Sequence, residues 1–321
     1  MSAVPESVFE RVDDLLTDLE RDRGIRVALA VARGSHAWGA ASPESDYDVG
    51  FVFVPDDLRR YAHLAGPPET IHEAVDTDDG DVELQGWDVR TFARLLADSN
   101  DGAIDLLRSP IRYRVAYEPM KLAAYVERTY NPMDLYHAWR GIATSNYRKY
   151  ISHHLVRTDD AIFPILEARE DEYVVETRGE EEADELDVDD GTRTIPIDDE
   201  RFTETQTKPT VKRNLTIYRA AMSARYLKAT GERDGHELPV IEFDRFLDEQ
   251  APSVFDDERI ERARALLERK WAGDGSEPIG DAVGREFAHP PHEIDPGRHA
   301  HSGPDPKRLD EFVDELIAAV R

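Results

Sequence analysis

The chain has 321 residues, no cysteine, and 68 acidic against 40 basic residues, which gives a formal net charge of −28 at pH 7. The absence of cysteine excludes disulfides and zinc sites built on thiolates. No stretch approaches the roughly 18 apolar residues of a membrane span, and no basic stretch with an apolar core opens the chain. We therefore expect a soluble, cytoplasmic protein that does not bind membranes.

The first predicted elements are a helix over 6–23 and a buried strand over 25–32, a short run rich in Val, Ile, Leu and Ala. The strand ends at Gly34 and Ser35, and a short helix over 36–41 follows. A glycine lets the backbone come close to a phosphate, while the serine hydroxyl and the free amides of the helix start can donate hydrogen bonds to it. The turn therefore predicts a phosphate-binding site.

Two aspartates follow in a second predicted strand over 45–54. Alternation places Asp46 and Asp48 on one face, because side chains two apart in a strand point the same way. Adjacent carboxylates repel unless a cation lies between them, and their hard oxygens suit magnesium. In a chain this acidic, such pairs also arise by chance, as at Asp76 and Asp78. The order of strand, turn, helix and strand therefore carries the prediction, rather than the pair alone.

The spacing of this segment resembles a known superfamily. The signature of DNA polymerase beta-like nucleotidyltransferases is similar to the arrangement found here, in which ten residues separate Gly34-Ser35 from Asp46-x-Asp48. The longer pattern Gly-Ser-x-Ala-x-Gly-x-Ala-x-Pro-x-Ser-Asp-Tyr-Asp-Val resembles their "predicted nucleotidyltransferase" branch, which includes proteins associated with RNA-repair operons. Further segments resemble that branch at 86–90, 99–100, 106–110, 212–227 and 239–247. The resemblance implies an α/β (α+β) fold with a small mixed sheet, a nucleoside triphosphate substrate and two magnesium ions, with manganese as the alternative metal.

The resemblance also implies a third carboxylate on a neighbouring strand. The alternating stretch 81–87 is predicted as that strand, with Glu83 as the first choice and Asp81 and Asp88 as alternatives. Asp88 directly precedes an amphipathic helix over 89–97, so the structural role predicted for it is N-capping. The expected catalytic and metal-binding residues are Asp46, Asp48 and Glu83.

A chain of this length is expected to form two domains. Residues 1–117 are predicted as the nucleotidyltransferase domain and 118–321 as a helical domain with an insertion at about 158–207. Within the insertion, the stretch 180–190 is nearly all acidic, which is typical of an exposed hairpin tip or a disordered loop. Short strands are predicted on either side of it, at 172–177 and 193–197. The helices predicted from apolar spacing are 121–130, 132–154, 211–230, 243–250, 256–272 and 307–321.

A basic segment interrupts the acidic background. No acid occurs over 205–231, where the six positive charges include Lys212, Arg213 and Arg219. We expect these three residues, together with the Gly34-Ser35 turn, to bind substrate phosphates. The alternative is that they pair with the acidic insertion or with the first domain.

The combined prediction is a magnesium-dependent enzyme that transfers a nucleoside monophosphate from a nucleoside triphosphate to a hydroxyl, with pyrophosphate leaving. An RNA 3′ end is the favoured acceptor. A protein hydroxyl, as in antitoxin-type members, and a non-catalytic nucleotide- or RNA-binding module are the alternatives, while base preference and oligomeric state stay open. With 7 lysines against 33 arginines, the composition also resembles that of salt-accumulating halophilic archaea. In molar salt the Debye length falls to about 3 Å, so the acidic surface would no longer repel RNA strongly.

Overall fold

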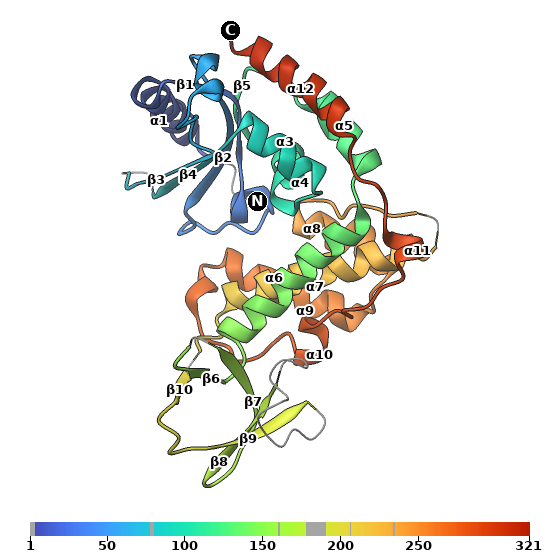
Figure 1. The fold of residues 1–321 in the computed structure, drawn as a ribbon. Helices are drawn as coiled ribbons and strands as arrows, with labels where there is room; N and C mark the ends of the chain where they lie inside the picture. Colours follow the sequence, from blue (N-terminus) through green and yellow to red (C-terminus); the bar gives the residue numbers. More distant parts are fainter. Residues whose placement is uncertain (1–3, 78–79, 160, 178–190, 206, 234) are drawn as a thin grey trace.

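The computed structural model describes residues 4–321 except 78–79, 160, 178–190, 206 and 234. One five-stranded sheet lies at each end of the molecule, and a group of helices separates the two sheets (Figure 1). The acidic stretch predicted as a hairpin tip or disordered loop lies outside the described residues. Within the described ranges, no helix combines the length and the apolar character that a membrane crossing requires.

The first sheet has the strand order β3-β4-β2-β1-β5. β2 runs parallel to β4, and the other neighbours are antiparallel, so the sheet is mixed, as predicted. The predicted bounds of β1 are confirmed at both ends, whereas β3 and β5 bury few side chains and give little apolar signal in the sequence. The strands are β1 (Ile25–Ala32), β2 (Tyr47–Pro55), β3 (Thr70–Val75), β4 (Val82–Asp88) and β5 (Arg112–Val115).

Helix α1 (Glu6–Arg23) covers one face of this sheet, and its predicted bounds are confirmed. Its apolar stripe, which includes Val12 and Leu16, is buried against the aromatic side chains of β2. Burying a large apolar side chain contributes on the order of 1.5 to 3 kcal/mol, so this stripe holds the helix in place. Gly24 ends the helix in the left-handed conformation, with φ 61°, and the chain turns directly into β1.

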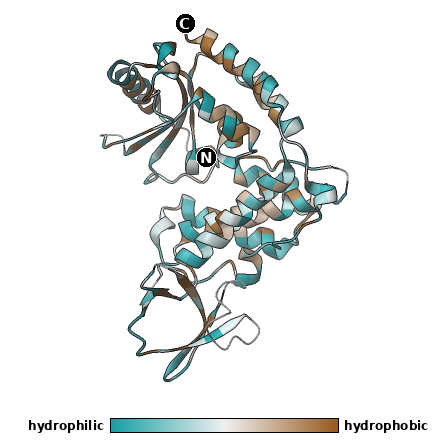
Figure 2. Ribbon diagram, in the orientation of Figure 1, coloured by the Kyte–Doolittle hydropathy of each residue, from teal (hydrophilic) through white to brown (hydrophobic). Residues whose placement is uncertain are grey.

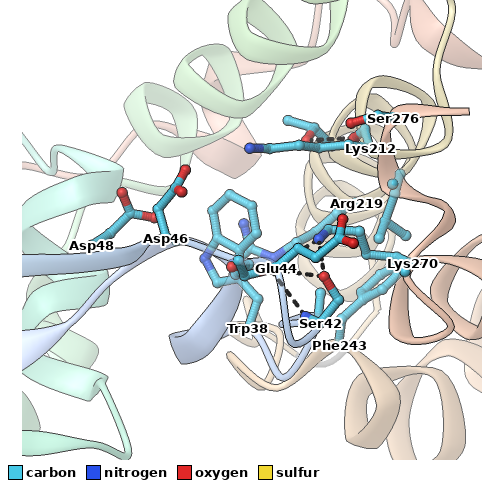
Figure 3. A pocket seen from close by; sticks show the side chains of 18 of the residues that line it. Trp38, Ser42, Glu44, Asp46, Asp48, Lys212, Arg219, Phe243, Lys270 and Ser276 are labelled. Atoms are coloured by element: carbon cyan, nitrogen blue, oxygen red, sulfur yellow. Dashed lines mark hydrogen bonds between the residues drawn. The ribbon is translucent and has the colours of Figure 1, made fainter. Parts of the chain in front are cut away.

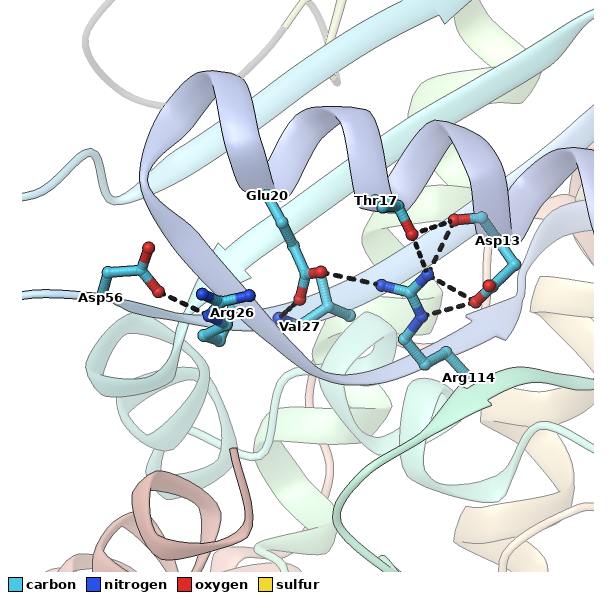
Figure 4. A network of polar contacts seen from close by, with 7 residues as sticks. All are labelled: Asp13, Thr17, Glu20, Arg26, Val27, Asp56 and Arg114. Carbon is cyan, nitrogen blue, oxygen red and sulfur yellow. Dashed lines mark hydrogen bonds and ion pairs between the residues drawn. The ribbon is translucent and has the colours of Figure 1, made fainter. Parts of the chain in front are cut away.

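Polar contacts fix the same helix to the edge of the sheet (Figure 4). Arg114 of β5 donates hydrogen bonds to Asp13 and Thr17, at 2.6 and 2.8 Å. It also contacts Glu20 at 3.2 Å, whose second oxygen accepts from the backbone N–H of Val27 at 2.7 Å. Arg114 therefore ties the helix to β5, and Glu20 ties it to β1.

The opposite face of the sheet is covered by helices from both ends of the chain. α3 (Val89–Ala97) and α4 (Asp101–Arg108) pack there, together with α5 (Met120–Thr129) and α12 (Pro306–Ala319). Brown and teal segments alternate along α12 (Figure 2), as expected of a helix with one buried face. Although α5 and α12 follow residue 118 in the sequence, their buried leucines belong to the core of the first sheet.

The central helices are longer and pack mainly on one another. α6 (Pro132–Tyr150) lies along α7 (Val211–Gly231), whose side chains are buried on most sides, and α9 (Asp257–Trp271) packs against α7. α6 ends before the predicted residue 154 because β6 begins there. The short helical segments are α2 (Gly34–Ala37), η1 (Leu58–Ala62), α8 (Phe243–Arg245), η3 (Phe246–Gln250), η4 (Ala251–Ser253), η5 (Asp274–Ser276), α10 (Arg285–Ala288) and α11 (Pro296–His299).

The second sheet is antiparallel, with the order β10-β6-β7-β8-β9, and is inserted between α6 and α7. The two strands predicted beside the acidic stretch are confirmed as β8 and β9, within one residue at each end. A small apolar core that includes Phe163 and Val175 holds the sheet together. Its strands are β6 (His154–Arg157), β7 (Ile162–Ala168), β8 (Glu172–Glu176), β9 (Thr192–Pro196) and β10 (Phe202–Thr205).

Candidate functional site

The turn after β1 is shaped around one aspartate. Gly34 has a φ of 55°, a conformation that favours glycine, and a Cβ atom there would lie 1.9 Å from a carboxylate oxygen of Asp48. The backbone N–H of Arg33 donates to the carbonyl of Asp48 at 2.7 Å. The helix predicted over 36–41 instead spans Gly34–Ala37, so both of its predicted ends are wrong. Glycine is therefore needed here because the turn and the carboxylate nearly touch.

The two aspartates come from a loop and a strand. Both were predicted to lie within the strand, which is right for Asp48 and wrong for Asp46. The strand begins at Tyr47 because a tight turn, closed by the N–H of Ser45 on the carbonyl of Ser42 at 3.0 Å, precedes it. Both carboxylates nevertheless face the same hollow (Figure 3).

Glu83 lies directly beside Asp48 in the sheet, because β2 and β4 pair in parallel with these two residues in register. Burial raises the pKa of Asp48, and the negative charges of Glu83 and Asp46 raise it further. Lys212 and Arg33 act in the opposite direction. The carboxylates therefore repel one another in the absence of a cation.

These groups line a cavity of about 340 Å³ between the first sheet and the central helices. On one wall are Gly34, Ser35 and the three carboxylates Asp46, Asp48 and Glu83. Lys212 and Arg219 of α7 stand on the opposite wall. Seven of the eight predicted site residues thus meet, and Arg213 is not among the lining residues.

The basic residues on α7 are engaged differently. Arg219 pairs with Asp105 of α4 at 3.3 Å and lies 4.1 Å from the ring centre of Trp38, with its side chain only 14% exposed. This contact matches the alternative of pairing with the first domain. Lys212 has no ion pair with any described residue, and its amine points toward Asp46 and Asp48 (Figure 3). Lys212 therefore presents a positive charge, unpaired among the described residues, to the carboxylates.

Sequence reasoning missed a second lysine in the same cavity. Lys270 of α9 is only 7% exposed, and its amine donates to the hydroxyls of Ser42 and Ser45 at 3.0 and 2.9 Å. Burial lowers its pKa, and the charge of Lys212 lowers it further. The signal was present in the sequence, since Lys270 continues the buried stripe of Ala263 and Leu267.

The alternatives for the third carboxylate occupy other places. Asp88 is 3% exposed, accepts a hydrogen bond from Tyr61 at 2.7 Å and caps α3 through the N–H of Arg90 at 3.0 Å. The N-capping role predicted for it is confirmed. Asp81 is exposed and precedes β4. Of these candidates, only Glu83 lines the cavity.

A family model also matches this chain over most of its length. The model described as the RNA repair pathway DNA polymerase beta family, RlaP, matches residues 8–315. The chain belongs to this family. Membership confirms the predicted resemblance to polymerase beta-type nucleotidyltransferases and to their RNA-repair branch.

Two further similarities are less extensive. The uncharacterized protein YcgL of Bacillus subtilis is 33% identical over 108 residues, which cover 34% of this chain and 40% of that protein. A crystal structure of a nucleotidyltransferase-like protein from Exiguobacterium sibiricum is 10% identical, with a TM-score of 0.29 over 98% of this chain and 89% of the other.

The donor set suits the divalent metal that nucleotidyltransferases of this superfamily generally use. Magnesium is held by one or two carboxylates together with phosphate oxygens, and Asp48 stands among carboxylates whose charges raise its pKa. Among the described residues, no group of three His, Cys, Asp or Glu side chains is close enough to hold an ion. The protein groups therefore fit a metal that is shared with substrate phosphates, rather than one held by protein ligands alone.

Proposed function

We propose that this protein transfers a nucleoside monophosphate from a nucleoside triphosphate to a hydroxyl acceptor, favoured here as an RNA 3′ end. The observation that carries the proposal is the cavity in which a glycine-serine turn and carboxylates face the unpaired Lys212. Membership of the RNA repair pathway DNA polymerase beta family supports both the transfer and the acceptor.

Each residue has a definite task under this proposal. Gly34 lets the backbone approach the triphosphate, and the hydroxyl of Ser35 donates a hydrogen bond to it. Lys212 and Lys270 offset the negative charge of the phosphates and of the departing pyrophosphate. The acceptor oxygen forms the new bond to the α-phosphorus, while the bond to the bridging oxygen breaks and the hydroxyl proton leaves to solvent.

The metal would be shared between substrate phosphate oxygens and the carboxylates Asp46, Asp48 and Glu83, with manganese as the alternative to magnesium. A bound metal would lower the pKa of the attacking hydroxyl and offset the negative charge of the phosphates. In that arrangement the carboxylates hold and orient it, and their mutual repulsion is relieved.

The decisive experiment replaces the two aspartates by Asn, singly and together. Labelled nucleotide incorporation into a short RNA, measured with magnesium in high potassium chloride, should fall by about a hundredfold or more. The melting temperature should not fall, because burial and repulsion already disfavour the charged form of Asp48. Asp76→Asn, at an exposed aspartate that does not line the cavity, is the matched control and should transfer like the wild type.

Two outcomes would contradict the proposal. Undiminished transfer by Asp46→Asn and Asp48→Asn would remove these carboxylates from the reaction. Nucleotide binding by the wild type without transfer to RNA or to any hydroxyl of a cellular extract would instead indicate a binding module.

A further inference from the structure

Beside the cavity, the end of α6 and the start of α7 bring aromatic and basic side chains together. Tyr150 is the last residue of α6, and the guanidinium carbon of Arg213 lies 3.7 Å from the centre of its ring. The amine of Lys149 lies 5.1 Å from the same ring centre. We call Lys149, Tyr150, Lys212 and Arg213 the basic ledge. Lys212 belongs to both the ledge and the cavity wall, so the two are continuous.

Within the described ranges, the cations of the ledge lack ion-pair partners, which is unusual for so acidic a chain. Among the described residues, no carboxylate forms an ion pair with Lys149, Lys212 or Arg213. Exposed arginines elsewhere commonly have such partners, as Arg21 does with Asp18 and Arg262 with Glu258. In a chain with 68 acidic residues, a cluster of cations that no described carboxylate pairs with indicates a surface that suits a negatively charged partner.

The ledge also offers a plane for stacking. Lys149 and Lys212 are exposed, and Tyr150 and Arg213 are half-buried. A guanidinium packed on an aromatic ring is held in one orientation and presents a flat cationic surface, on which an unpaired base can stack. Proteins that bind single strands combine such stacking surfaces with cations that follow the phosphates. A peptide partner would use the charges and leave the stacking plane without a function.

We propose that the basic ledge binds single-stranded RNA and directs its 3′ end toward Asp46 and Asp48. This inference rests on the proposed function, because the cavity must accept a hydroxyl for the strand to matter. A base of the RNA stacks on Tyr150 and Arg213, and the RNA phosphates contact Lys149. Lys212 lies where the ledge meets the cavity.

The test measures binding of a fluorescent 12-nucleotide single-stranded RNA at several potassium chloride concentrations. Lys149→Glu and Arg213→Glu should each weaken binding by about tenfold or more and lower the slope of log affinity against log salt by about one. Tyr150→Ala should cost about tenfold through lost stacking, while Tyr150→Phe should keep most of the affinity. The matched control is Lys121→Glu on α5, an exposed lysine without an acid partner among the described residues, which should bind like the wild type.

Two further measurements separate this inference from the proposed function. Lys149→Glu and Tyr150→Ala should bind magnesium ATP like the wild type by calorimetry, whereas Asp46→Asn should bind RNA like the wild type and lose transfer by about a hundredfold or more. Ledge variants that bind RNA as well as Lys121→Glu would overturn the inference, as would an equal loss of nucleotide and RNA binding. A wild-type protein that modifies a protein hydroxyl but does not bind RNA would also overturn the inference about the ledge. The proposed transfer of a nucleoside monophosphate would then still be supported.

Discussion

At the scale of single residues, the contact between Gly34 and Asp48 shows why the glycine-serine turn and the carboxylates form one unit. The turn takes a φ of 55°, and the missing Cβ leaves room for the carboxylate of β2. The sequence alone offers one reason for a glycine here, because a phosphate can approach the backbone closely. The structure adds a second reason, since any side chain would displace the aspartate that the proposed chemistry needs.

The first prediction follows from this contact. Gly34→Ala should reduce nucleotide transfer by about a hundredfold or more, because its Cβ would collide with Asp48 and move that carboxylate. Gly66→Ala is the matched control, with a φ of 61° and nothing within 4 Å of the added Cβ. Both variants carry a backbone cost of about 1 to 2 kcal/mol. Full transfer by Gly34→Ala would show that the position of Asp48 is not critical.

At the scale of elements, three histidines join the segment after α7 to α11. Nε2 of His236 lies 2.8 Å from Nδ1 of His299, and the ring of His301 stands 5.2 Å from that of His236. Burial, together with the neighbouring His299 and His301, lowers the pKa of His236 to about 4. The folded protein therefore keeps His236 neutral over a range in which the unfolded chain binds a proton.

The second prediction concerns pH. Because the folded pKa of His236 is about 4 and the unfolded value is about 6.5, folding stability should decrease as pH falls between these values. The charged groups around His299, namely Glu232, Lys228, Asp295 and Arg298, act on the same cluster. In His236→Gln, the melting temperature should fall less steeply between pH 7 and pH 4 than in the wild type. His63→Gln, at an exposed histidine directly after η1, should keep the wild-type slope, and equal slopes in all three proteins would contradict the assignment.

At the scale of the whole molecule, the dominant property is a net charge of −28. Self-repulsion of this size destabilises the compact state, and dissolved salt screens it. With 40 basic residues, ion pairs can neutralise only part of the 68 acidic residues. We therefore propose that the protein is adapted to concentrated salt.

The third prediction tests that adaptation. Raising potassium chloride from about 0.1 M to about 1 M shortens the Debye length from about 10 Å to about 3 Å, and the melting temperature should rise by on the order of 5 °C. Glu10→Gln and Asp14→Asn, exposed on α1 without ion pairs among the described residues, should raise it at low salt only. A melting temperature that stays constant or falls with salt would show that repulsion does not limit stability.

The sequence by itself determined the elements whose periodicity is local. Helix α1 and strand β1 have the predicted bounds, because an apolar stripe or a short buried run with a glycine at its end is complete within one segment. The Gly34-Ser35 turn and the aspartates were recognisable for the same reason, since their spacing along the chain is fixed. The family followed from that spacing, and the comparison confirms it.

Only the tertiary structure decided which distant residues share the site. Lys270 contacts Ser42 across 228 positions of sequence, and Arg219 meets Asp105 across 114. The strand register that sets Glu83 beside Asp48, and the meeting of Tyr150 with Arg213, likewise depend on how elements pack. Local patterns fix which face of a helix or strand is buried, but they do not fix its neighbour, because many partners can cover the same apolar stripe.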